Sequence, residues 1–249
     1  MLKEERFDII LRELNGRKKV LSAELSSLLE VSEDTIRRDL NELAEKKLLR
    51  KVHGGALPYF FNPPSYEKRK ELAIDKKFKI ARKTSKLFKE DQVILTDGGT
   101  TNLEALRQLP LDFCMTVFTN SLPIADLLSE YKNIETYFIG GRLFKESRAT
   151  VGTETLNWLS NIHADLCLIG VCSLSLEHGA TAPDWEESRV KKAMMESSRE
   201  VAALVISDKI QTEDAYKFGE ITDIDYLVTE LDEDDEMLLP YKNIGLHIL

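Results

Sequence analysis

Apolar residues recur at helical spacing in three short segments at the start of the chain. Positions i, i+3, i+4 and i+7 lie on one face of a helix, so this spacing predicts helices over Glu4–Leu14, Ala23–Leu29 and from Glu33 to about Ala44. Val20–Leu21 is expected to be an apolar link, and Ser22 is expected to cap the second helix. Short helices in this order predict a helix-turn-helix over about Val20–Asp39.

The third helix presents basic and hydroxyl side chains away from its apolar stripe of Ile36, Leu40 and Leu43. Ser32 is expected to cap its N-terminus. A strand over 48–52 and a tight turn at 53–55 follow, which predicts a β-hairpin wing. Such a helix and wing are suited to phosphates and base edges in a major groove. The residues expected to bind DNA are Ser32, Glu33, Thr35, Arg37, Arg38, Arg50, Lys51, His53 and Gly54.

From residue 75 onward the pattern changes to alternating strands and helices. Strands are expected at 93–95, 115–119, 134–139, 166–171, 201–206 and 226–229, and helices at 75–88, from 101 to 109, and at 123–129, 152–159 and about 185–199. This alternation predicts a largely parallel sheet covered on both faces. We expect domains at 1–57 and 75–249, joined by a proline-containing linker at 58–74 whose aromatic residues Tyr59–Phe61 dock on one domain. The lysines of the 75–88 helix are expected to form a solvated face.

Charge is distributed unevenly along the 249 residues, whose net charge is −9. Residues 1–90 hold 22 Lys+Arg against 15 Asp+Glu, a net charge of +7, whereas residues 91–249 have a net charge of −16. This asymmetry indicates a basic DNA-facing end and an acidic body. No apolar run approaches membrane-spanning length, and neither the three cysteines nor the four histidines show metal-ligand spacing. We therefore expect a cytoplasmic protein without a cofactor or metal.

The motif S-x-x-T-I-R-R-D-L at 32–40 and the pair Gly54-Gly55, together with the upstream Arg6, Ile10 and Leu14, resemble the DeoR family of bacterial transcription regulators. The resemblance continues in the D-x-G-T-T, T-N-S and G-G loops at 97–101, 119–121 and 140–141. It implies a winged helix-turn-helix followed by a Rossmann-like α/β effector domain similar to ribose-5-phosphate isomerase. It also implies a phosphorylated sugar or related metabolite as the effector, and control of sugar-metabolism genes.

Ligands of parallel sheets bind outside the carboxyl ends of the strands, where these loops lie. There the backbone N–H groups and helix dipole of Asp97–Thr101 could hold a phosphate. Effector binding is expected from Asp97, Gly98, Gly99, Thr100, Thr101, Asn120, Ser121, Gly141, Glu187, Lys191 and Lys209. The family usually has an aspartate three residues before the lysine that Lys209 matches, but this chain has Ile206 there and Asp208 next to the lysine.

Three functions can be weighed from the sequence, and the first is the one that it favours. The first is a repressor that binds operator DNA as a homodimer or homotetramer and is relieved by a sugar phosphate. The second is a sugar-phosphate isomerase-like enzyme, with Glu187 or Asp97 as its base. The third is a protein-interaction module that uses the wing. Each motif also has a plainer interpretation: Arg37 and Arg38 could pair with Asp34 and Asp39, and Glu187 and Lys191 could form a surface ion pair at i, i+4.

Overall fold

The computed structural model describes the chain except for residues 1, 18–19, 47, 53 and 59–63. The chain forms two compact units, Met1–Pro63 and Pro64–Leu249. The aromatic segment Tyr59–Phe61, which we expected to dock on one domain, lies outside the described residues.

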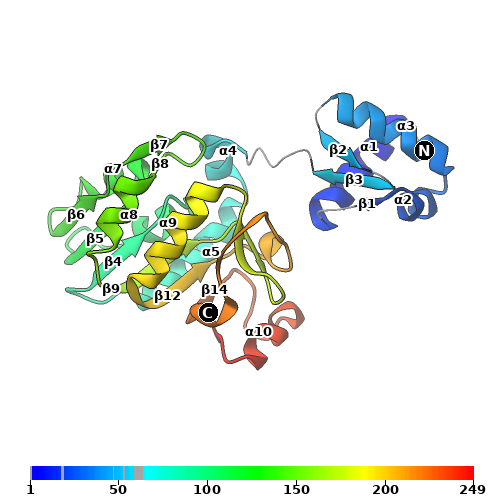
Figure 1. Cartoon of the computed structure of the whole chain (residues 1–249). Coiled ribbons are helices and arrows are strands. Elements are labelled where there is room, and N and C mark those ends of the chain that lie inside the picture. The colour runs from blue at the N-terminus through cyan, green and yellow to red at the C-terminus, as the bar shows by residue number, and fades with distance from the viewer. Residues whose placement is uncertain (1, 18–19, 47, 53, 59–63) are drawn as a thin grey trace. The chain divides into compact units, whose positions relative to one another are not determined.

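The first unit consists of three helices and a small antiparallel sheet (Figure 1). The helices are α1 (Lys3–Arg17), α2 (Ser22–Leu29) and α3 (Glu33–Glu45), and the strands are β1 (Val20–Leu21), β2 (Leu49–Val52) and β3 (Gly55–Pro58), in the order β1-β3-β2. The predicted stripe of α3 is fully buried at Ile36, Leu40 and Leu43. This arrangement confirms the winged helix-turn-helix.

Two local predictions in this unit were wrong. Val20–Leu21 is a strand that pairs with β3, not a simple link. As a result Leu21 is extended and occupies the N-cap position of α2, so Ser22 is the first helical residue and does not cap the helix. The close approach of β1 to β3 depends on glycine, because a Cβ at Gly55 would lie 2.0 Å from the Val20 carbonyl oxygen.

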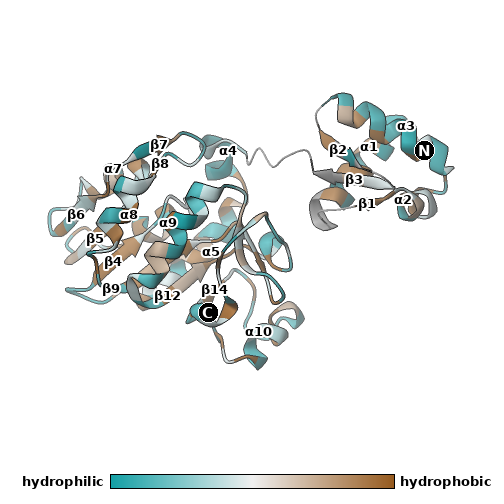
Figure 2. Cartoon of the chain, viewed as in Figure 1, coloured by the Kyte–Doolittle hydropathy of each residue, from teal (hydrophilic) through white to brown (hydrophobic). Residues whose placement is uncertain are grey.

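The second unit is built around a seven-stranded sheet in the order β15-β14-β12-β9-β4-β5-β6, with every neighbouring pair parallel. The strands are β4 (Val93–Thr96), β5 (Met115–Thr119), β6 (Ile134–Phe138), β9 (Ala164–Gly170), β12 (Ser198–Leu204), β14 (Tyr226–Val228) and β15 (His247–Ile248). Figure 2 shows that these strands are largely hydrophobic, as expected for a sheet covered on both faces. The predicted parallel α/β fold is confirmed.

Helices cover the two faces of this sheet with separate apolar cores. α5 (Ile74–Thr84), α6 (Thr100–Arg107) and α7 (Leu122–Leu128) contribute to one core. α8 (Thr153–Leu159) and α9 (Trp185–Glu196) contribute to the other, and lie in front of the sheet in Figure 1. Alternate residues of a strand enter opposite cores, as Leu166 and Cys167 of β9 do.

Several smaller elements were not predicted. The hairpin of β7 (Arg142–Phe144) and β8 (Ala149–Val151) follows β6, and β10 (Ser173–Ser175), β11 (Gly179–Ala182) and β13 (Tyr216–Gly219) form a three-stranded sheet. The short helix α10 (Leu239–Asn243) precedes β15. In the segment 58–74 that we expected to be a linker, residues Tyr66–Glu71 form helix α4, which Ser65 caps by accepting a hydrogen bond from the Lys68 N–H.

Candidate functional site

The N-terminus of α3 is held by the predicted cap. Ser32 Oγ accepts a hydrogen bond from the Thr35 N–H at 3.2 Å and lies 2.9 Å from Thr35 Oγ1. Glu33 and Asp34 occupy the first turn, where the helix dipole favours carboxylates. The N-terminus of α3 is therefore capped, and hydroxyl and charged side chains project from its first two turns.

Arg37 and Arg38 project from α3, and their side chains are 66% and 82% exposed. Both pair with Asp34, at 2.5 and 3.1 Å, as the plainer interpretation of the sequence expected. Exposed pairs of this kind contribute only about 0–1 kcal/mol, so they can be exchanged for contacts with DNA phosphates at little cost.

Asp39 has a different partner from the one considered from the sequence. Its carboxylate is buried and accepts two hydrogen bonds from Arg6, at 2.7 and 3.1 Å, which join α1 to α3. Arg6 and Asp39 therefore position α3 against α1, while Arg37 and Arg38 remain exposed.

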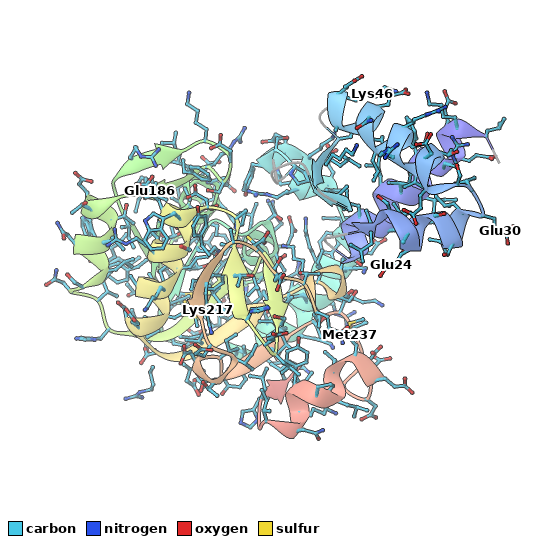
Figure 3. All side chains as sticks on the ribbon, turned by 45° about the vertical axis from the view of Figure 1, so that its right-hand side comes forward. Glu24, Glu30, Lys46, Glu186, Lys217 and Met237 are labelled. Carbon is cyan, nitrogen blue, oxygen red and sulfur yellow. The ribbon has the colours of Figure 1, made fainter. Side chains whose placement is uncertain are left out.

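The wing has a described turn residue and one described basic side chain. Gly54 has φ +80°, a left-handed conformation that glycine adopts without strain, and it is exposed. Lys51 is exposed and donates to Asn41 Oδ1 of α3 at 2.6 Å, so wing and helix share one surface. His53 and the side chain of Arg50 lie outside what the structure describes. Glu24, Glu30 and Lys46, labelled in Figure 3, mark other outward positions of this unit.

In the second unit, Asp97 directly follows β4 and organises the polar loop before α6. Its Oδ1 accepts hydrogen bonds from the Gly99 N–H at 3.3 Å, the Gly170 N–H at 2.9 Å and Asn102 Nδ2 at 2.5 Å. Its Oδ2 is paired with Lys191 of α9. The carboxylate thus joins three adjacent elements at the C-terminal edge of the sheet.

Lys191 is buried with Asp97, at 5% exposure for each residue. Its ammonium also donates to the Gly170 carbonyl at 2.6 Å. Burial lowers the pKa of Lys191, but the Asp97 carboxylate, together with Cys172 and Glu187, more than offsets this and the net shift is upward. The surface pair of Glu187 and Lys191 considered from the sequence is replaced by this buried pair with Asp97.

Thr100 and Thr101 form the first turn of α6, with Gly99 at the N-cap position and no side-chain cap. The first N–H groups of a helix have no partner within the helix, so this turn can accept an anion. Gly98 is packed closely on the next loop: a Cβ there would lie 3.0 Å from Ala149 Cβ and 3.2 Å from the Ser147 carbonyl oxygen. The loop is therefore a tight turn that leads into a helix N-terminus without a side-chain cap.

The predicted residues of neighbouring strands lie at the same sheet edge. Ser121 caps α7 by accepting from the Ile124 N–H at 3.4 Å. Asn120 donates to the Thr150 carbonyl at 2.7 Å, and its buried Oδ1 has no hydrogen-bond partner among the described residues. That oxygen can accept a hydrogen bond from a hydroxyl group of a ligand.

Glu187, Lys209 and Gly141 have different environments. Burial raises the pKa of Glu187, although Lys191 opposes the shift. Lys209 donates to the Val171 carbonyl at 2.9 Å, and burial lowers its pKa. Gly141, with φ +153°, packs against Thr155, where a Cβ would lie 2.2 Å from the threonine oxygen. The close packing on Thr155 thus explains why position 141 is a glycine.

The position that the family usually fills with aspartate is apolar here. Ile206 packs against the core on the α5 and α6 face of the sheet. Asp208 is exposed and pairs with Lys76 of α5 at 3.0 Å. Asp208 is therefore committed to an ion pair with α5. Sequence reasoning missed Asn102, whose contact with Asp97 cannot be read from local spacing.

A hollow lined by His163–Asp165 and Glu196–Arg199 lies where β9 and β12 begin, at the sheet edge opposite the Asp97 loop. In the part of the chain that the structure describes, no group of three His, Cys, Asp or Glu side chains could hold a metal ion. No described helix combines the length and apolar character needed to cross a bilayer.

A winged helix-turn-helix unit followed by a parallel α/β unit with a polar loop at its C-terminal edge defines a DNA-binding regulator with a sensor domain. Residues 6–58 match the DeoR-like helix-turn-helix domain and residues 72–231 match the DeoR C terminal sensor domain. The chain belongs to the DeoR family and is a DNA-binding transcription regulator.

Curated relatives are similar over nearly the whole chain. The HTH-type transcriptional repressor GlcR of Bacillus subtilis (strain 168) is 36% identical over 232 residues, 92% of this chain and 89% of that protein. The glycerol-3-phosphate regulon repressor of Escherichia coli (strain K12) is 29% identical over 231 residues, 92% of each chain. Among solved structures, ribose 5-phosphate isomerase A from Methanocaldococcus jannaschii gives a TM-score of 0.41 at 17% identity, over 55% of this chain and 54% of that chain.

Proposed function

We propose that the chain is a repressor of sugar-metabolism genes that binds operator DNA through its first unit and is released by a phosphorylated sugar or related metabolite bound to its second unit. The observation that carries this proposal is the uncapped first turn of α6, at Thr100 and Thr101, beside a buried Asp97–Lys191 pair. The relatives named as repressors, one of them of a glycerol-3-phosphate regulon, support the same function.

The ligand site combines two kinds of recognition. The helix N-terminus offers N–H donors and a positive dipole to a phosphate. The unpaired Oδ1 of Asn120 offers an acceptor to a hydroxyl group. A small molecule that carries both a phosphate and hydroxyl groups fits these features, and a phosphorylated sugar is such a molecule.

An isomerase would need a free carboxylate base beside the phosphate. Asp97 is not free, because three N–H donors and Lys191 hold its two oxygens. Turnover would then depend on Glu187, the other candidate base; we propose sensing without turnover. Incubating the protein with ribose 5-phosphate and assaying for ribulose 5-phosphate, beside an assay of DNA binding, separates the two functions: steady turnover would contradict the proposal.

Changing Arg37 to alanine is expected to weaken operator binding by roughly 1–3 kcal/mol if this side chain reads a base. The fold should persist, because the side chain is 66% exposed and Asp34 keeps Arg38 as a partner. The measurement is affinity at fixed salt for a duplex that the wild-type protein selects from a random library. Arg199→Ala, an exposed arginine of the second unit, is the matched control. An Arg37→Ala protein that binds like the control would place Arg37 outside the interface.

We also propose that the protein binds DNA as a homodimer or homotetramer. One winged helix makes few base contacts, and linking two of them raises the effective affinity for paired half-sites. The half-sites should lie about one helical turn, or a multiple of it, apart. Light scattering at micromolar concentration, with and without the selected duplex, tests this: a monomer in both states would refute it.

A further inference from the structure

Among the basic side chains of the second unit that form no ion pair with a described carboxylate, three lie near one another: Arg69 of α4, Lys77 of α5 and Lys209 at the end of the 3-10 turn Ser207–Lys209. Each donates only to a backbone carbonyl. Arg69 Nη2 donates to Glu146 at 3.0 Å, Lys77 Nζ donates to Arg69 itself, and Lys209 Nζ donates to Val171 at 2.9 Å. Among the described ion pairs of this unit, none includes any of the three.

Lys77 is the most unusual of them, because it is 4% exposed. A buried ammonium without an opposite charge is unfavourable. The pKa of Lys77 is lowered to about 8, mainly by burial and also by the nearby charges of Lys209 and Arg69, and only Glu104 opposes this shift. The preceding residue, Lys76, differs because its charge is paired with the carboxylates of Asp208 and Glu230.

The three cations border the loop that begins with Asp97. α4 and α5 both pack against α6, whose first turn holds Thr100 and Thr101. Lys76 donates to Ser207 Oγ at 2.8 Å, which holds α5 against the turn that carries Lys209. Arg69 donates to the Glu146 carbonyl. The next residue, Ser147, has its carbonyl oxygen packed against Gly98 of the Asp97 loop.

We propose that Arg69, Lys77 and Lys209 form an anion site that takes the phosphate group of the effector beside the first turn of α6. The assignment of the ligand as effector rests on the proposed function, whereas the anion site itself does not. An incoming dianion supplies the opposite charge that the three cations lack, and charge-assisted hydrogen bonds to buried donors are the strong ones. The site draws two of its three cations from α4 and α5, which precede the sheet in the chain.

The first test uses inorganic phosphate and the full chain without DNA, at constant ionic strength set with chloride. Phosphate should bind the wild-type protein by calorimetry and raise its Tm. Lys77→Met should weaken phosphate binding at least about tenfold, as loss of a charge-assisted hydrogen bond implies, and should raise the Tm of the phosphate-free protein, since an unpaired buried charge is removed. Lys79→Met, which removes an exposed lysine of the same helix, should change neither quantity.

Lys209→Met provides a second variant in case Lys77→Met does not fold, and it should also weaken phosphate binding. Wild-type protein that does not bind phosphate, or either variant that folds and binds it like wild type, would overturn the site. Ribose 5-phosphate and ribose extend the test: only the phosphorylated sugar should lose affinity in the variants. If phosphate binding depends on Lys77 but no sugar phosphate alters DNA affinity, the anion site stands and the proposed regulation fails.

The pH dependence gives an independent readout with sulfate, whose charge is constant over the range used. Lys77 must be protonated to bind an anion, and its pKa of about 8 lies below its ordinary value of 10.5. Sulfate affinity should therefore be level below about pH 8 and fall above it. The groups facing Lys77 are Arg69 of α4, Lys209 and Glu104 of α6, of which only Lys209 also loses charge toward alkaline pH. Unchanged sulfate affinity between pH 7 and 10 would contradict the assignment.

Discussion

Replacing Thr100 and Thr101 together by alanine is expected to leave operator binding near normal and to abolish the response to the metabolite. Both residues are at least nine-tenths buried, at 8% and 7% exposure, in the first turn of α6, so the change removes two hydroxyl groups at the proposed phosphate site. They are distant in sequence from α3 and the wing, and the DNA-binding residues are unchanged. The double variant should therefore remain a repressor that no longer senses its effector.

The size of the lost response follows from linkage. A ligand shifts the affinity for DNA only if it binds the DNA-free and DNA-bound arrangements differently. Such coupling is typically about 1–3 kcal/mol, or roughly 5–150-fold in affinity, and DNA must weaken the metabolite by the same factor. The wild-type protein should show this factor in both directions, and the variant should show neither.

The measurement is operator affinity with and without the phosphorylated sugar that raises the Tm of the wild-type protein most. Thr153→Ala combined with Thr222→Ala is the matched control, because both threonines are exposed in the same unit. A Thr100→Ala/Thr101→Ala protein that still responds fully would show that the loop is only a turn between β4 and α6.

The recognition helix could be predicted from the sequence because its determinants are local. The Ser32 cap and the stripe of Ile36, Leu40 and Leu43 lie within one element, and the structure has both. Ser22 was predicted wrongly for a non-local reason. β1 pairs with β3, more than thirty residues later, and this pairing sets where α2 begins.

The parallel strands could also be predicted, because strands buried on both faces are continuous apolar runs. β10 and β11, with the sequences Ser-Leu-Ser and Gly-Ala-Thr-Ala, contain no such run and were missed. Their pairing in an antiparallel sheet is determined by tertiary contacts with β13. Short strands of small residues give no periodic signal by themselves.

The ligand loop could be located from the sequence, but its contacts could not. The three N–H donors to Asp97 include Gly170, 73 residues away, and its partner Lys191 is 94 residues away. The environment of the α5 lysines was also not predictable from local sequence. We expected a solvated face, yet Lys77 is 4% exposed. Helical periodicity identifies the apolar face, but it does not show that a charged residue at its border is covered by α4.

The buried pair of Asp97 and Lys191 should be the most sensitive charged position of the second unit. Asp97→Asn removes the negative charge and leaves the buried Lys191 without its carboxylate partner. Breaking one partner of a buried pair typically costs about 3–5 kcal/mol. The exposed pair of Lys217 and Glu220 is the control, and Lys217→Met should cost at most about 1 kcal/mol.

Tryptophan fluorescence measures this unit selectively, because both tryptophans of the chain, Trp158 and Trp185, lie in α8 and α9. We expect urea unfolding followed in this way to show a large loss of stability for Asp97→Asn. Adding Lys191→Met to it should recover part of the loss, since the second change removes the charge that was left unpaired. If the double variant is as unstable as the sum of the single ones, the two residues act independently, and Asp97 stabilises the loop only through the N–H groups of Gly99 and Gly170 and the Asn102 amide.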